Sequence, residues 1–78
     1  MKSKYIIFDV LGLEVPVVFC PVIQHEQIKL GNFKPVAAGF CRSMVNGWEC
    51  WGKSVSLNLD SRPREDEFIL NKHLQRDC

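Results

Sequence analysis

The 78-residue chain lacks long hydrophobic runs and an excess of charge of either sign. Its longest apolar stretch, residues 15–22, is interrupted by Pro16 and Pro21 and is far too short to span a membrane. Ten Lys and Arg residues nearly balance nine Asp and Glu residues, which argues against a partner such as long nucleic acid. The first residues contain two lysines but only a brief apolar segment before Asp9, unlike a signal peptide. We therefore expect a protein that makes no membrane contact.

The chain also lacks the cysteine pairs that are typical of zinc sites. Its cysteines are Cys20, Cys41, Cys50 and Cys78, none of which belongs to a CxxC motif or lies close to a histidine. We expect no metal and no cofactor. Free thiols are expected in a reducing compartment, although Cys41 and Cys50 flank a predicted turn closely enough to pair. Cys78, as the last residue, is expected to be exposed.

Hydrophobic residues make up 46% of the chain and charged residues 24%, which indicates a folded chain rather than a disordered one. A mass of this size predicts one domain, residues 1–78, with a single thin core. Residues 4–10 and 13–19 predict a β-hairpin around Leu11-Gly12, with Val10 opposite Leu13. Pro16 favours an edge position for the second strand, because proline has no N–H to donate.

Residues 22–30 are interpreted as a short helix that begins near Pro21 and ends at Gly31-Asn32. Their apolar stripe is weak, so a loop is the alternative. Residues 34–45 and 48–59 then predict a second hairpin around Asn46-Gly47, with Val45 opposite Trp48 and Cys41 opposite Gly52. The alternation puts one apolar face in the core: Val36, Ala38, Phe40, Trp51, Val55, Leu57 and Leu59.

The opposite face carries mostly small side chains, and we expect it to meet solvent, a ligand or a second subunit. Its candidate ligand-facing residues are Gly39, Cys41, Gly52, Ser54 and Ser56. The last element is predicted to be a helix that starts at Asp60 to Pro63, with an acidic first turn and a basic last turn that match its dipole. Its predicted buried stripe is Ile69, Leu70, His73 and Leu74. The predicted fold is therefore α+β in two layers, with two hairpins each followed by a helix (β-β-α-β-β-α).

The sequence contains no catalytic motif, and we expect no enzyme. His25 is interpreted as a surface residue. Trp48 at the second turn is a candidate partner anchor, the alternative being a tryptophan covered by a helix or subunit. Three arginines complete the predicted partner site: Arg42, Arg62 and Arg64. The alternatives are a salt bridge or cation–π pair for Arg42, and a solvated helix start for the other two.

Three segments resemble a family of short, uncharacterised proteins of tailed bacteriophages and prophages. They are residues 34–40 (KPVAAGF), 51–57 (WGKSVSL) and 59–66 (LDSRPRED), which follow a KPVxAGF … SVSLxLxSRP pattern and differ from its commonest form at Lys53 and Arg64. The resemblance implies a non-enzymatic accessory protein in the cytoplasm of a bacterial host. Small phage proteins of this kind often bind a host protein to inhibit antiviral defence. The alternatives are a nucleotide or nucleic-acid binding module that uses Arg62, Arg64 and Lys34, and a homo-oligomeric structural phage component.

Overall fold

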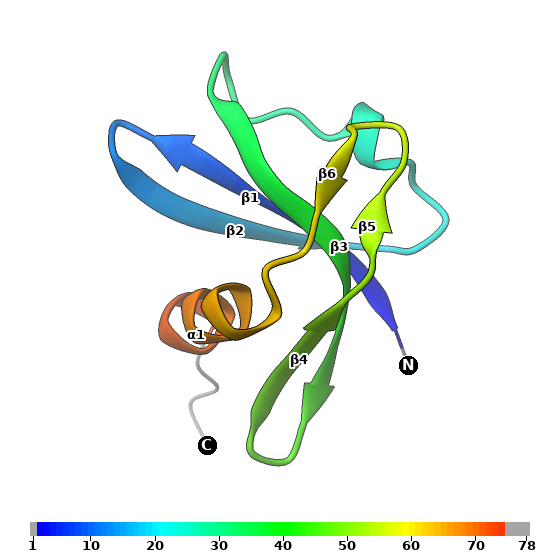
Figure 1. Ribbon diagram of the computed structural model, residues 1–78, viewed down its shortest axis with the longest axis vertical. Helices are drawn as coiled ribbons and strands as arrows, with labels where there is room; N and C mark the ends of the chain where they lie inside the picture. The colour runs from blue at the N-terminus through cyan, green and yellow to red at the C-terminus, as the bar shows by residue number, and fades with distance from the viewer. Residues whose placement is uncertain (1, 75–78) are drawn as a thin grey trace.

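The computed structural model describes residues 2–74, which form mostly β-strands and one α-helix (Figure 1). A four-stranded antiparallel sheet has the order β2-β1-β3-β4, and a separate two-stranded sheet pairs β5 with β6. The strands are β1 (Ser3–Val10), β2 (Leu13–Phe19), β3 (Lys34–Met44), β4 (Gly47–Trp51), β5 (Lys53–Ser54) and β6 (Leu59–Asp60), and the helix is α1 (Pro63–His73). Cys78 lies outside the described residues.

The predicted α+β fold with two helices is wrong, because residues 22–30 form only a single 3-10 turn, η1 (His25–Gln27). The imidazole of His25 points inward, where Nε2 donates to the Gly39 carbonyl at 3.0 Å and the ring meets Phe19 and Phe40 edge-on. This loop is therefore held against the sheet by one buried histidine and by a few separate apolar side chains. Its apolar residues do not form the continuous stripe that a helix would present.

The first hairpin has the predicted register, with Val10 opposite Leu13. Leu11 and Gly12 both have positive φ, as a two-residue turn of this kind requires. The β2 strand lies at one edge of the sheet, and Pro16 sits in its middle opposite Ile7. An edge position accommodates the missing N–H of proline, so this prediction is confirmed.

In the second hairpin the turn lies one residue earlier than predicted, so each cross-strand partner differs by two residues. Met44 pairs with Gly47, so Val45 and Asn46 form the turn and Cys41 faces Cys50. Gly47 comes directly after the turn, and its φ is +140° and its missing side chain leaves room for the Asn71 amide of α1. A contact with the helix, which local turn chemistry does not encode, therefore sets this register.

Because of this shift, the predicted long last strand is divided. The chain bends at Gly52, where φ is +79°, and then forms the short β5–β6 hairpin. Val55 stands on its turn and is 82% exposed, contrary to its predicted place in the core. Leu57 and Leu59 do pack over the sheet, as predicted.

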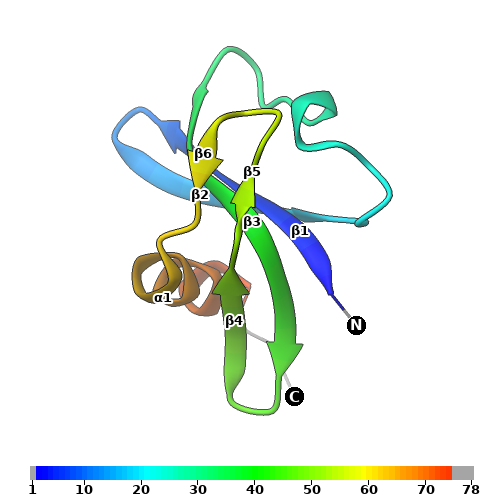
Figure 2. The same ribbon diagram turned by 45° about the vertical axis from the view of Figure 1, so that its right-hand side comes forward.

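The core occupies both faces of the four-stranded sheet, whereas the sequence predicted only one. One cluster lies beneath α1 and contains Tyr5, Ile7, Ala37, Cys41, Cys50 and Leu70. The other lies beneath the loop that contains η1 and the β5–β6 hairpin, and it contains Ile6, Phe8 and Ala38. Figure 2 shows α1 beside β4, and the β5–β6 hairpin close to β3.

The helix begins as predicted with Pro63 in its first turn, although the N-cap is Arg62 and not Asp60 or Ser61. Leu70 is completely buried, but His73 is exposed, so the predicted stripe is only partly right. The buried member that the pattern misses is Asp66, one turn before Leu70.

We expect Leu70→Ala to lower the free energy of unfolding by about 3 kcal/mol, because it leaves a cavity between α1 and the sheet. Phe68→Ala on the same helix is the control, since Phe68 is 68% exposed and its loss should change stability by less than about 0.5 kcal/mol. Urea unfolding of the two variants tests this placement of the helix, and equal losses would contradict it.

Candidate functional site

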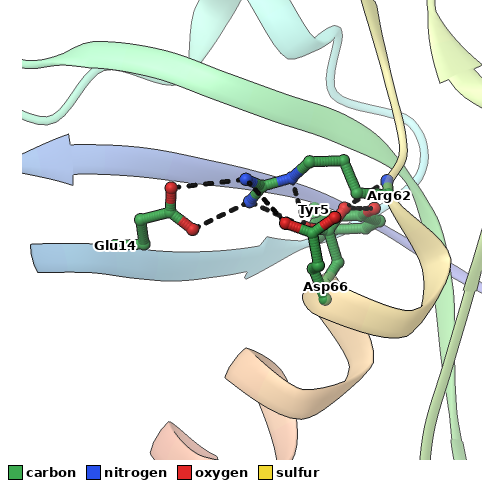
Figure 3. Close-up of polar contacts among 5 residues, drawn as sticks. Tyr5, Glu14, Arg62 and Asp66 are labelled. Atoms are coloured by element: carbon green, nitrogen blue, oxygen red, sulfur yellow. Dashed lines mark hydrogen bonds and ion pairs between the residues drawn. The ribbon is translucent and has the colours of Figure 1, made fainter.

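Arg62 is part of a charged network that joins the start of α1 to the sheet (Figure 3). Its guanidinium lies 3.0 Å from Glu14 Oε1 on β2 and 2.9 Å from Asp66 Oδ1 on α1. Its backbone N–H also donates to Asp66 Oδ2 at 2.8 Å. The predicted partner residue Arg62 thus has most of its hydrogen-bonding capacity engaged within the chain.

Asp66 is the buried centre of this network, with no exposed surface. The hydroxyl of Tyr5, equally buried on β1, donates to Asp66 Oδ2. Burial and this hydrogen bond raise the pKa of Tyr5 above its usual value, so the phenol stays protonated. A buried carboxylate is tolerated because it has charged and hydrogen-bonded partners on several sides. The network holds α1 in place on the sheet.

Arg42 and Arg64, the other predicted partner residues, are exposed and lie on different parts of the molecule. Arg42 pairs with Glu49 across β3 and β4, with 2.6 Å between Nε and Oε1, and about half of each side chain is exposed. Exposed pairs of this kind contribute little to stability. Arg64 lies on α1 beside a shallow hollow that also includes Glu65 and Ile69. The four predicted partner residues therefore do not form one site.

The small-residue face of β3, a candidate ligand surface, is covered within the molecule, Cys41 by Leu70 of α1 and Gly39 by Trp51 and Ser61. Gly39 and Cys41 are buried, and a Cβ at Gly39 would collide with the backbone carbonyl of Trp51. The small side chains allow close packing inside the molecule, and they do not admit a ligand. The β3 members of the predicted ligand surface are therefore buried in this structure.

The remaining members of that predicted surface lie apart from β3. Ser54 is buried, and its hydroxyl accepts the Leu57 N–H within the β5–β6 turn. Gly52 and Ser56 are exposed at separate bends. No ligand surface joins these residues.

Trp48 does lie beside a hollow, as a partner anchor would. This hollow, the tip groove, is an open cavity of about 930 Å³ between the β3–β4 turn and the second half of α1. The residues that line it are Ser43, Met44, Val45, Asn46, Gly47, Trp48, Phe68, Asn71, Lys72 and Leu74. Trp48 is half-buried in its wall, and its backbone N–H donates to Asn71 Oδ1 at 3.1 Å.

Large apolar side chains are unusually exposed in the tip groove. Val45 is fully exposed, Phe68 is 68% exposed and Met44 is 44% exposed. Among residues 2–74, Lys72 is the charged residue in the lining, and none of the lining residues is a carboxylate. The groove is therefore an apolar surface with a positive rim.

Sequence patterns alone missed Phe68, Met44 and Val45 as site residues. Phe68 gave a signal, because it falls off the buried stripe of a helix that otherwise follows its pattern. The turn residues gave no such signal, because the sequence pattern places Val45 in the strand, whereas the structure places it in the turn.

Within residues 2–74, no three His, Cys, Asp or Glu side chains lie close enough together to hold a metal ion. Burial raises the pKa of the Cys41 and Cys50 thiols to about 12, which suppresses their nucleophilic form. His25 lies with Phe19 and Phe40, on the other face of the sheet from these thiols.

We expect Arg62→Ala to lower the free energy of unfolding by about 2 kcal/mol, because Asp66 would keep its buried charge and lose its cation. Arg64→Ala, on the other side of Pro63, should cost less than about 0.5 kcal/mol. Chemical denaturation of both variants distinguishes a structural arginine from an exposed one. A negligible effect of Arg62→Ala would contradict the role given to the network.

Burial lowers the pKa of His25 below its usual value, although the hydrogen bond to Gly39 acts in the other direction. The unfolded chain therefore binds more protons at this residue, and the free energy of unfolding should fall as the pH drops through about 6.5. In urea titrations between about pH 7.5 and pH 5.5, His25→Gln should weaken this pH dependence, by up to about 1 kcal/mol. The exposed His73 provides the control, and a His73→Gln variant should keep the dependence of the unchanged chain.

The positions of the polar and apolar side chains are the basis on which a function can be assigned. Among residues 2–74, no helix is long and apolar enough to cross a membrane. No family model matches the chain, and neither does any curated protein or solved structure.

Proposed function

We propose that this protein is a non-enzymatic binding protein that takes a segment of a host protein into the tip groove. The observation that carries this proposal is the exposure of Phe68, 68%, next to Val45 and Met44 in one hollow. A cluster of exposed apolar side chains costs solubility, and on small proteins such clusters usually mark interaction surfaces. The phage resemblance supports a bacterial host protein as the partner, in the host cytoplasm, with inhibition of antiviral defence as the consequence.

The chemistry of the groove favours an apolar segment flanked by acidic residues. The apolar walls offer Phe68 and Trp48 as large contact surfaces, and aromatic side chains often dominate binding energy. Lys72 on the rim, without a lining carboxylate, favours acidic side chains beside the apolar segment. An acidic, amphipathic stretch of the partner satisfies both conditions.

The groove is also held in shape before a partner arrives. Asn71 accepts the Trp48 N–H, and its amide fills the space that Gly47 leaves open. The turn and α1 are therefore joined to each other at the floor of the groove. A preformed surface loses less conformational entropy on binding, which supports tight association.

The nucleotide alternative receives less support from these contacts. Arg62 is bound to Glu14 and Asp66, and Gly39 and Cys41 are buried. Self-association through the tip groove is a different possibility from binding of a host protein, and sedimentation distinguishes the two.

The test is affinity capture from bacterial host lysate with the unchanged chain, the groove variant Val45→Ser/Phe68→Ser and the control variant Val55→Ser. Val55 is as exposed as the groove residues but lies on the β5–β6 turn. We expect a host protein that the unchanged chain and the control capture and that the groove variant does not. Capture that is equal for all three chains would contradict the proposal.

The captured protein is then purified and its Kd is measured. Phe68→Ser should raise the Kd at least tenfold, or about 1.4 kcal/mol, and Lys72→Glu should have a similar effect that weakens with salt. Lys29→Glu, an exposed charge change elsewhere, is the matched control. If no host protein binds and sedimentation shows a dimer that Phe68→Ser dissociates, a second copy occupies the groove and the host-protein proposal is wrong.

A further inference from the structure

Two cysteines face each other in the core beneath α1. Cys41 on β3 is the direct cross-strand partner of Cys50 on β4, and both thiols are free. Their exposed fractions are 0% and 3%. This pairing differs from the diagonal arrangement that the predicted register implied, and it brings the two side chains onto the same face of adjacent strands.

The hydrogen bonds of β4 show which kind of cross-strand pair this is. The Cys50 N–H donates to Glu67 Oε2 of α1 at 2.9 Å, and the Trp48 N–H donates to Asn71 Oδ1. Both N–H groups thus point away from β3, so Cys41 and Cys50 form a non-hydrogen-bonded pair. In such pairs the Cα atoms lie about 4.5 Å apart, which is within the range of about 4.4 to 6.8 Å that disulfides span.

We infer that Cys41 and Cys50 form a dithiol site that is oxidised to a cross-strand disulfide when α1 separates from β4. The oxidant is a low-molecular-weight disulfide such as oxidised glutathione. One thiolate attacks it, forms a mixed disulfide and releases one glutathione thiol. The second cysteine then attacks the mixed disulfide, which releases the other glutathione. Overall, two protein thiols lose two electrons and two protons, and one oxidised glutathione becomes two reduced molecules.

The helix controls access to this site. Leu70 packs against the two thiols from above, and Glu67 binds the Cys50 backbone. Burial, with the nearby charges of Asp66 and Glu67 at Cys50, raises both thiol pKa values to about 12. The reactive thiolate is therefore scarce while α1 is closed, and it becomes accessible when the helix opens.

Two side chains of α1 accept backbone hydrogen bonds from β4. Glu67 and Asn71 supply the bonds to β4, whereas Asp66 anchors the helix to β1 through Tyr5. Removal of the first pair leaves the Asp66 network and the buried Leu70 intact. The variant Glu67→Ala/Asn71→Ala therefore raises the frequency of opening and leaves the rest of the core unchanged.

The experiment treats the full chain, carrying Cys20→Ser and Cys78→Ser to remove the other thiols, with excess oxidised glutathione. The remaining thiols are alkylated at intervals and the products are identified by mass spectrometry. Trypsin cuts after Arg42, so the disulfide joins two separate peptides, residues 30–42 and 43–53. We expect this linked pair, its reversal by dithiothreitol, and formation at least tenfold faster in the Glu67→Ala/Asn71→Ala background.

Two results would overturn the inference. One is that the loosened chain still yields only reduced thiols or glutathione adducts, since the cysteines would then be unable to reach each other. The other is an equal rate of disulfide formation in both backgrounds, since α1 would then not control access. Circular dichroism before oxidation verifies that the loosened chain is folded, and a Cys50→Ser variant identifies signals that do not come from this pair.

Discussion

The fold depends on one buried carboxylate. Asp66 has no contact with solvent, yet it lies in the first half of α1, where the helix dipole favours negative charge. It accepts hydrogen bonds from Tyr5 on β1 and from Arg62, whose guanidinium continues to Glu14 on β2. A buried charge needs all of these partners at once, so the start of the helix has essentially one position on the sheet. The rest of α1 follows from that position.

Once α1 is fixed, it covers the edge of β4 and forms one side of the tip groove. Glu67 and Asn71 accept the outward N–H groups of Cys50 and Trp48, which would otherwise be open to another strand. Leu70 closes the core on the same face, and Phe68 is turned outward. The same helix thus buries the dithiol pair and presents the apolar surface, because Phe68 and Leu70 are two residues apart and so lie about 200° apart around its axis.

Local sequence patterns predicted the parts of the fold that are determined by residues close together in the sequence. The turn at Leu11-Gly12, its register and the helix start at Pro63 all follow from short-range chemistry, and the structure confirms them. The second hairpin fails because Asn71, distant in sequence, determines where the chain turns. The small residues of β3 were predicted to form an open surface. Their burial depends on the position of α1, and that position is set by Asp66, an acidic residue that a hydrophobic pattern does not reveal. Of the predicted site, only Trp48 lies beside the tip groove.

Pro16 has a consequence for how this protein behaves among its neighbours. It interrupts the outer edge of β2, and the side chains of α1 cover the outer edge of β4, so neither edge of the four-stranded sheet offers an unbroken row of donors and acceptors. Sheet extension from molecule to molecule, the usual route from a small β-protein to fibres, is thereby blocked at both ends. A chain this rich in strands can then reach high concentration in a crowded cell and still expose an apolar hollow.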